Sequence, residues 1–151
     1  MNSTHKQFRC YMDWTRGAYV LTDDKNRLDF DAVCRLLADT YWAADRPRNI
    51  MELAIRNSVC LSLFAAGQQV GFCRAVTDHA TFTWICDVII HPVYRGQGLG
   101  KWMVRCLIDH PGLQTRSQVL ATKDAHGLYE RFGFERKEYL KRMPGAKILS
   151  G

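Results

Sequence analysis

The hydrophobic pattern of the first third of the chain predicts one strand followed by a helix. Residues 1–17 are polar and are expected to be irregular, and the apolar run 18–21 is expected to form the first strand. From Asp29 onward apolar residues recur at helical spacing, and Asp29 or Asp31 can cap the helix. The recurring positions are Val33, Leu36, Leu37 and Tyr41. Pro47 ends or interrupts this helix, because proline lacks the amide proton that a helix interior needs.

A change of period marks the middle of the chain. A second helix is expected over residues 48–57. Its apolar face is formed by Ile50, Leu53 and Ala54. Strand-like runs follow at 59–64, 70–77 and 81–91 and predict a three-stranded antiparallel unit. The last run is rich in β-branched and aromatic residues and is expected to be the central strand.

The last third of the chain predicts two more helices and three short strands. Apolar residues recur from Leu99 to Leu107 at the spacing of a long amphipathic helix. A strand at 118–121 precedes a short helix that ends at Gly133. Two brief strands at 134–137 and 139–143 complete the expected core. Together the pattern predicts an α/β fold with about seven strands flanked by about four helices.

Length and composition limit the class of protein. The chain has 151 residues, of which 47% are hydrophobic, so it can bury one core and is too short for two ordinary domains. We expect a single domain over residues 1–151, with roughly the first 15 and the last 7 residues peripheral. The polar N-terminal stretch and the absence of a long apolar run predict neither a secretory signal nor a membrane span. The expected location is therefore cytoplasmic.

Charge and cysteine content narrow the choice of ligand. The formal charge of +6 favours an anionic ligand. No block of about five basic residues occurs, so neither a nucleic-acid partner nor a membrane partner is expected. The six cysteines include no C-x-x-C pair and no cluster with histidines, so no metal site is expected. Reduced cysteines in apolar strands are expected to be buried hydrophobic residues and suit the cytoplasm.

A glycine-rich turn, Arg95-Gly96-Gln97-Gly98-Leu99-Gly100, joins the expected central strand to the long helix. Free amides at a helix N-terminus bind anions and glycines allow close approach, so this turn predicts a phosphate-bearing ligand. The dinucleotide fingerprint fails because Lys101 stands at its last glycine. The P-loop fails because Arg95 and Trp102 occupy required positions, and a kinase loop would join two strands.

The turn resembles the [RQ]-x-x-G-x-[GA] signature of the GNAT superfamily of acyl-CoA-dependent N-acyltransferases. Residues 87–94 (DVIIHPVY) resemble the strand and proline turn that precede the signature, and residues 125–134 (AHGLYERFGF) resemble a later A-x-x-L-Y-E-x-x-G-F segment. The resemblance covers roughly residues 59–136. It implies the single-domain GNAT fold, with a mixed and mainly antiparallel sheet, and the activity of an N-acetyltransferase.

The resemblance also implies acetyl-CoA as cosubstrate. In this family the turn holds the CoA pyrophosphate through its backbone amides, and the preceding strand pairs with the pantetheine arm. The positions implied are Ile89, Ile90, Arg95, Gly96, Gln97, Gly98, Leu99, Gly100, Lys101 and Thr122. Thr122 departs from the family pattern, in which an asparagine is frequent, because a hydroxyl replaces only one of the amide's hydrogen bonds.

In such enzymes the amine attacks the thioester directly, so no nucleophilic cysteine is required. The resemblance places Tyr129 where a general acid protonates the departing thiolate. Tyr129 also lies on the apolar side of its helix, so the alternative is a packed residue whose hydroxyl is hydrogen-bonded. Asp87 is the catalytic candidate in the central strand, where it could orient the amine, relay its proton through water or bond to a neighbouring loop. Weaker candidates for the base are Glu52, His79 and His91.

The acceptor site is expected near the end of the first helix, a region that lines the acceptor pocket in related folds. Trp42, Asp45 and Trp84 are the expected substrate-binding residues. Aromatic rings with Asp45 and Asp87 would suit a cationic amine. Alternatively, Tyr41 and Trp42 close the core and Arg46 is solvated. The acceptor stays open among a small-molecule amine and a peptide or protein amine, and pairing of the C-terminal strands would allow a homodimer.

Two other function classes compete with this interpretation. A noncatalytic acyl-CoA-binding or sensing module would keep the pocket and lack turnover. A nucleic-acid-binding protein rests only on the net charge, and no recognition motif supports it.

Overall fold

The computed structural model describes residues 10–147. This part of the chain contains one six-stranded sheet. The strands are β1 (Asp13–Arg16), β2 (Tyr19–Thr22), β3 (Val59–Ala65), β4 (Gln68–Thr77), β5 (Phe82–Ile90) and β6 (Ser117–Leu120), and they lie in this order across the sheet. The first five strands pair antiparallel, and β6 pairs parallel with β5. The predicted mixed and mainly antiparallel sheet is confirmed, with six strands in the described part.

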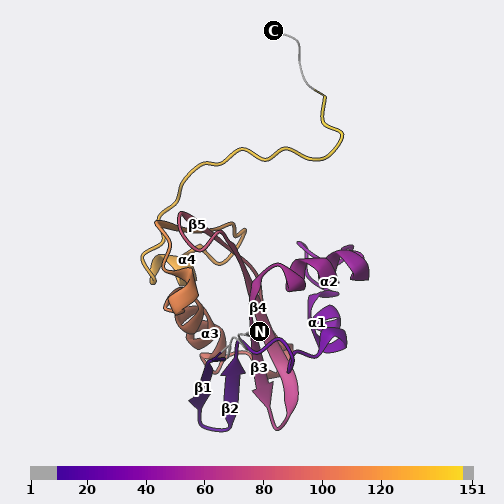
Figure 1. Cartoon of the computed structure of the whole chain (residues 1–151), viewed down its shortest axis with the longest axis vertical. Helices are drawn as coiled ribbons and strands as arrows, with labels where there is room; N and C mark the ends of the chain where they lie inside the picture. Colours follow the sequence, from indigo (N-terminus) through magenta and orange to yellow (C-terminus); the bar gives the residue numbers. More distant parts are fainter. Residues whose placement is uncertain (1–9, 148–151) are drawn as a thin grey trace, which may run out of the picture.

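Helices cover both faces of the sheet (Figure 1). They are α1 (Phe30–Leu37), α2 (Arg48–Arg56), α3 (Leu99–Ile108) and α4 (His126–Glu130), with short 3₁₀ turns η1 (Pro92–Tyr94) and η2 (Pro111–Leu113). Apolar residues of α1 and α2 pack with Phe72 and Ile89 on one face, and those of α3 pack with Leu61 and Leu63 on the other. Within residues 10–147, no helix has the length and apolar character needed to cross a bilayer.

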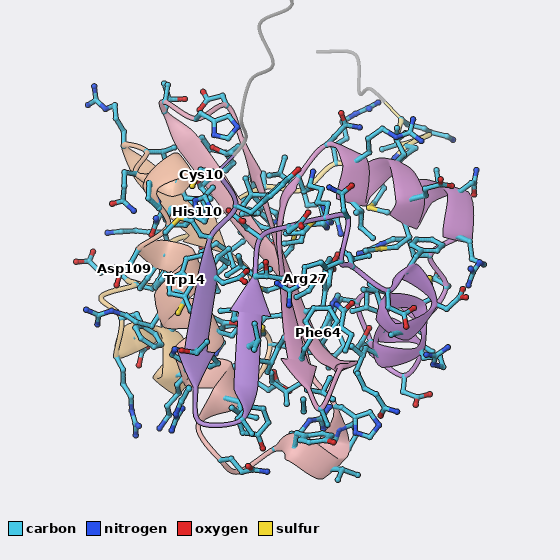
Figure 2. The ribbon with its side chains drawn as sticks, turned by 60° about the horizontal axis from the view of Figure 1, so that its bottom comes forward. Cys10, Trp14, Arg27, Phe64, Asp109 and His110 are labelled. Atoms are coloured by element: carbon cyan, nitrogen blue, oxygen red, sulfur yellow. The ribbon has the colours of Figure 1, made fainter. Side chains whose placement is uncertain are left out.

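A hairpin at the N-terminal edge was not predicted. Residues 13–16 form β1 and pair with β2 across a two-residue turn in which Gly17 has φ 57°. His110, just after α3, connects this hairpin to the rest of the molecule. Its Nε2 lies 2.9 Å from the Oδ2 of Asp23, which follows β2. Its ring centroid lies 6.1 Å from that of Trp14 in β1 (Figure 2). The expectation of an irregular segment is therefore wrong for residues 13–16, and its part over residues 1–9 lies outside the described residues.

The first helix is shorter than its apolar spacing predicted. Asp29 caps α1 by accepting a hydrogen bond from the amide of Ala32 at 3.0 Å. The helix ends at Leu37 because the hydroxyl of Thr40 donates to the Leu37 carbonyl at 2.8 Å, a local bond that competes with helix continuation. Tyr41 and its neighbours therefore lie in the loop 38–47 instead of at the end of the helix.

The buried face of α2 also differs from the prediction. Met51 and Ile55 are buried, whereas Ile50 and Leu53 are 48% and 53% exposed. Met51 and Ile55 belong to the core cluster that includes Phe72 of β4. Two apolar sets at helical spacing share this short helix, and contact with the sheet decides which of them is buried.

The two C-terminal strands predicted at 134–137 and 139–143 are absent from the described part of the chain. Residues 135–147 are exposed, and Leu140 makes no contact that shields it from water. The segment is rich in charged residues, so neither of its faces can be buried against β6 without desolvating charge. The homodimer was expected to form by pairing of these strands. Because the described part of the chain does not contain them, the homodimer stays a prediction without that support. The predicted peripheral C-terminal end falls partly on residues 148–151, which lie outside the described residues.

Candidate active site

Strand β5 separates from its parallel neighbour β6 midway along its own length. The β5–β6 pairs run from Phe82–Ser117 to Ile85–Leu120 and stop there. Beyond Ile85, the described part of β5 pairs only with β4. The second edge of the strand therefore presents unpaired backbone groups in the opening between β5 and β6, where an extended ligand can pair with them.

A β-bulge lies where the two strands separate. Arg74 pairs with Cys86 and Phe72 pairs with Ile89, so β5 has one more residue than β4 between these pairs. Asp87 occupies the bulge with φ 55°, a left-handed conformation that costs a non-glycine residue about 1 kcal/mol. The extra residue changes which side chains of β5 face α1 and α2. Asp87 consequently meets Arg46 of the loop 38–47, on the side where Ile89 packs.

The glycine-rich turn ends at the N-terminus of α3. Gly96 and Gly98 adopt φ 79° and 76°, which glycine accepts without steric cost. No side chain caps α3, so its first amides are available to an anion. A Cβ placed on Gly96 would meet nothing within 4 Å, so the turn is open to a ligand on that side. The geometry fits a phosphate group.

Two arginines and a tyrosine fix the glycine-rich turn. Arg95 is not simply solvated, because its Nε donates to the carbonyl of Ile90 at 2.9 Å. From the hairpin, Arg16 donates to the carbonyls of Gly98 and Gln97 at 3.1 and 3.4 Å. The hydroxyl of Tyr19 donates to the Gln97 side chain at 2.8 Å. The sequence analysis missed Arg16 and Tyr19, since no local signal links an N-terminal hairpin to a turn so distant in sequence.

A cleft of about 910 Å³ opens beside the separated strands. Its walls come from the loop 38–47, from β5, from residues 120–125, from α4 and from residues 139–142. Of the predicted site residues, it brings together Trp42, Trp84, Asp87, Thr122 and Tyr129. Asp45 is exposed and lies outside this lining, as does the whole glycine-rich turn. A neighbouring cavity of about 570 Å³ shares Thr122 and Tyr129 with it.

Two pairs of aromatic rings line the cleft. Tyr41 and Trp42 pack edge to face in the loop 38–47, with ring centroids 4.8 Å apart. Trp84 of β5 packs against Tyr139 of the C-terminal segment at 6.0 Å. Tyr41 and Trp42 are 59% and 39% exposed, so they do not close the core as the alternative interpretation held.

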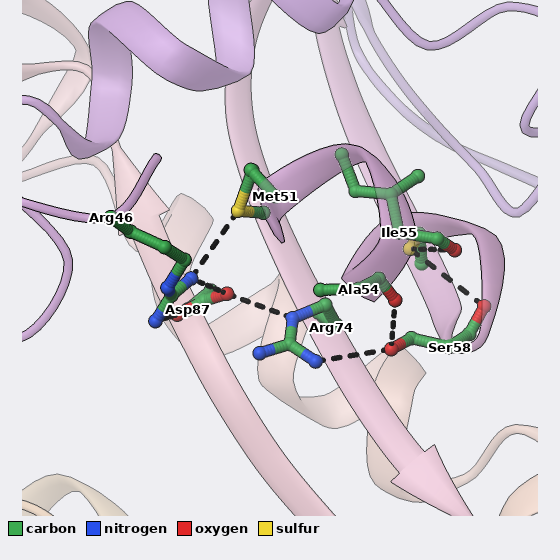
Figure 3. Close-up of polar contacts among 8 residues, drawn as sticks. Arg46, Met51, Ala54, Ile55, Ser58, Arg74 and Asp87 are labelled. Carbon is green, nitrogen blue, oxygen red and sulfur yellow. Dashed lines mark hydrogen bonds and ion pairs between the residues drawn. The ribbon is translucent and has the colours of Figure 1, made fainter. Parts of the chain in front are cut away.

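Asp87 is the centre of a buried ionic network, shown in Figure 3. Its side chain is buried, and both of its carboxylate oxygens accept hydrogen bonds from arginines. Arg46 donates to Oδ2 at 2.7 Å and to Oδ1 at 3.2 Å, and Arg74 donates through Nε to Oδ2 at 2.8 Å. Arg74 also donates to the hydroxyl of Ser58 at 3.1 Å. Of the three roles considered for Asp87, this geometry favours a bond to neighbouring residues.

Tyr129 on α4 lines the cleft from a buried position. Its ring packs edge to face on Phe134 at 6.0 Å, and only 9% of the residue is exposed. Burial raises the pKa of Tyr129 to about 12. Within residues 10–147 no group hydrogen-bonds to its hydroxyl. The nearby hydroxyl of Thr122 accepts from the amide of Ala125 at 3.0 Å, so it already holds the start of α4.

The other titratable candidates do not combine into a site. Cys86 lines the cleft, but burial raises the pKa of its thiol to about 11, so it is not a thiolate near neutral pH. Glu52, His79 and His91 lie outside the lining of the cleft. His79 contacts the carbonyl of Gly112 at 2.9 Å, and His91 accepts a hydrogen bond from the amide of Val93. Among the residues that the structure describes, no group of three or more potential metal ligands could hold an ion.

The sequence analysis also missed Arg74, although a signal was present. Arg74 interrupts the apolar strand 70–77, and a charged residue in a buried strand needs a partner. Asp87 occupies the adjacent strand in the same way. Opposite charges in two adjacent apolar strands were a signal for an ion pair, although the register that brings them together is not fixed by the sequence pattern.

Comparison with known proteins identifies similar chains. Residues 56–136 match the family model described as "Acetyltransferase (GNAT) domain". A protein of Gibberella zeae named "Putative acetyltransferase FG08082" is 29% identical over an alignment that covers 90% of each chain. The "Uncharacterized N-acetyltransferase ycf52" of Pyropia yezoensis is 33% identical, with 65% of this chain and 60% of that protein covered.

Solved structures agree with these matches. A crystal structure from Xanthomonas campestris pv. campestris, described as "a putative acetyltransferase belonging to the gnat family", has a TM-score of 0.79 at 38% identity. The match covers 84% of this chain and 94% of that one. Glucosamine-6-phosphate N-acetyltransferase from Arabidopsis thaliana matches with a TM-score of 0.61, 85% of this chain and 99% of that one being covered. At 15% identity, this second likeness shows the fold alone.

Proposed function

This chain belongs to the GNAT acetyltransferase family, and from that premise we propose that it transfers an acetyl group from acetyl-CoA to a primary amine in a ternary complex. The observation that carries the proposal is the hydroxyl of Tyr129 in the cleft beside the separated strands β5 and β6, where no residue of 10–147 engages it. A proton donor and an opening for an extended ligand thus occupy one site. Enzymes of this family acetylate amines.

The described residues fit acetyl-CoA. The first amides of α3, with Gly96, Gly98 and Gly100, would hold the pyrophosphate, and Arg95 and Lys101 would add positive charge. Ile89 and Ile90 would offer backbone groups to the pantetheine arm. Bound acetyl-CoA supplies the activated acetyl group as a thioester. Thr122 would act through the start of α4, because its hydroxyl oxygen already accepts the Ala125 amide.

Tyr129 is proposed as the general acid. A phenol whose pKa is raised to about 12 keeps its proton at neutral pH and can donate it to the sulfur of the departing thiolate as the C–S bond breaks. Its packed ring and unpartnered hydroxyl support this role over that of a purely structural tyrosine. Asp87 is proposed as a positioning residue: it holds Arg46 and Arg74 at the cleft, and its oxygens are occupied by their N–H groups.

The acceptor is proposed to lose its ammonium proton to water in the open cleft. With Asp87 bound by two arginines, the acidic limb of the kcat/KM profile should follow the pKa of the acceptor amine. Two acceptors whose ammonium pKa values differ by about two units should shift the midpoint by about the same amount. A midpoint that stays fixed for both acceptors and disappears in Asp87→Asn would instead identify Asp87 as the base.

The direct test combines calorimetric titration with acetyl-CoA and a thiol-release assay over a panel of amines. Binding with release of CoA thiol on at least one amine supports the proposal. Binding without release on any acceptor favours the noncatalytic acyl-CoA-binding module, and absence of binding refutes both. The cytoplasmic location stays a prediction, supported by the six unpaired cysteines.

A further inference from the structure

Basic side chains outnumber acidic ones around the cleft. Its basic lining residues are Arg46, Arg74, Lys123, Lys141 and Arg142. Its acidic lining residues are Asp87 and Asp124. From the sequence, the aromatic rings with Asp45 and Asp87 were expected to suit a cationic amine. Asp45, on which that expectation partly rested, lies outside the lining.

Part of the excess charge lies at the buried end of the cleft. The side chains of Arg46 and Arg74 are 21% and 11% exposed, and both bind the single carboxylate of Asp87. One carboxylate balances one of two guanidinium charges, so one positive charge has no counter-charge among the described residues. Poor exposure to water strengthens the interaction of that charge with any anion that enters.

Arg74 keeps donors free for such an anion. Its Nε is bonded to Asp87 and its Nη1 to Ser58. Its Nη2 has no hydrogen-bond partner among residues 10–147, and Nη2 is not a fully buried atom. A guanidinium held in place on one side and free on the other can bind a carboxylate or a phosphate with little further loss of side-chain freedom.

We propose that the acceptor is a small primary amine that also carries an anionic group, and that Arg74 and Arg46 bind this group. The inference rests on the proposed acetyl transfer and names the substrate class for it. Trp42 and Trp84 pack against the carbon skeleton of the acceptor, and the exposed cations at the mouth attract the anion. Carboxylate and phosphate share the chemistry that the arginines recognise.

The first experiment compares acceptors that differ only at the end remote from the amine. The series is 4-aminobutyrate, 4-aminobutan-1-ol and 1,4-diaminobutane, with phosphoethanolamine and ethanolamine as the phosphate arm. Thiol release should show kcat/KM about tenfold or more higher for the anionic member of each set. The arm with the greater preference identifies carboxylate or phosphate as the preferred anion.

The second experiment reverses the charge of exposed residues, whose substitution should not affect folding. Lys123 and Arg142 are exposed, so the double variant Lys123→Glu with Arg142→Glu should fold normally. It should lower kcat/KM for the anionic acceptors about tenfold and raise it for the diamine. Arg105→Glu is the matched control, because Arg105 is an exposed residue of α3 outside the cleft lining. This control should leave the order of acceptors unchanged.

The buried arginine is tested through its conservative variant. Arg74→Gln should abolish the preference for the anionic member, and Arg74→Lys should restore part of it, while acetyl-CoA affinity measured by calorimetry stays the same. Equal use of the alcohol, the diamine and the acid by the unaltered protein would overturn the inference and leave the acetyl transfer standing. Acetyl-CoA binding with no thiol release on any of these amines would overturn the proposed function, and the inference with it.

Discussion

Tyr129 combines a packed ring with a hydroxyl that no described residue engages. If this hydroxyl is the proton donor, Tyr129→Phe should lower kcat by about 10²–10⁴-fold, the range for loss of a general acid. The ring would still pack on Phe134, so the dissociation constant for acetyl-CoA and the melting temperature should change little. Single-turnover thiol release and calorimetry provide the measurement. Turnover within about twofold of the unaltered protein would leave Tyr129 a structural residue.

The pH dependence follows from the same burial. The pKa of Tyr129 in the folded state, about 12, lies above the ordinary value of about 10 for a phenol. The proton is therefore fully present below about pH 10 and is lost only as the pH rises through the folded value. Below about pH 10, kcat should show no alkaline limb due to Tyr129. Any alkaline limb in that range should persist in the residual activity of Tyr129→Phe.

Variants of Asp87 show how much the ionic network contributes to the free energy of unfolding. Asp87→Ala leaves two poorly exposed guanidinium groups without their partner and places alanine at φ 55°, so the free energy of unfolding should fall by about 3–5 kcal/mol. Asp87→Asn should cost less, because asparagine tolerates the left-handed conformation and its carbonyl still accepts hydrogen bonds. Urea unfolding of both variants measures the difference. Equal stability of Asp87→Ala and the unaltered protein would show that the network contributes nothing.

At the scale of elements, the N-terminal hairpin supports the glycine-rich turn. Arg16→Ala removes two of the three hydrogen bonds that the hairpin makes to this turn, those at the carbonyls of Gln97 and Gly98, and leaves the bond from Tyr19. The variant should weaken acetyl-CoA binding about tenfold, because a looser turn loses more freedom when it binds the ligand. Calorimetry measures the change, and the melting temperature should move little because Arg16 is exposed.

A second arginine near the same hairpin provides the control. Arg27 pairs with Asp13 of β1 at 3.0 Å and does not touch the turn. Arg27→Ala should therefore leave acetyl-CoA affinity unchanged. If both variants weaken binding equally, the effect comes from the hairpin as a whole and not from the contacts of Arg16.

The order of elements could be predicted from the sequence because its apolar residues recur every two residues in the strands and about every 3.6 residues in the helices. The strands near 59–64, 70–77 and 81–91 and the helix that follows the glycine-rich turn are confirmed. Details set by contacts between elements could not be predicted. The side of α2 that is buried depends on where Phe72 lies, and β1 has too few apolar residues to reveal its pairing with β2.

At the scale of the whole molecule, the candidate site depends on the β-bulge in β5, which the sequence pattern does not predict. Asp87 and Tyr129 were both expected near the site, and the cleft contains both. The bulge brings Asp87 to Arg46 and Arg74, residues from two other parts of the chain. Such a pairing needs the register of β4 and β5, which alternation of apolar residues alone does not fix.

The reactivity of the six cysteine thiols, which are spread over the whole molecule, tests whether the acetyl group passes directly to the amine. Cys10 is exposed, whereas burial raises the pKa of Cys60 to about 12 and that of Cys86, the cysteine in the cleft, to about 11. A maleimide near neutral pH should therefore label Cys10 first and leave Cys86 unlabelled until the protein is denatured. Turnover should survive labelling of Cys10, and Cys10→Ser should remove the fast reaction. An acetyl group found on Cys86 by mass spectrometry after incubation with acetyl-CoA alone would instead indicate an acyl-cysteine intermediate, which direct attack by the amine does not require.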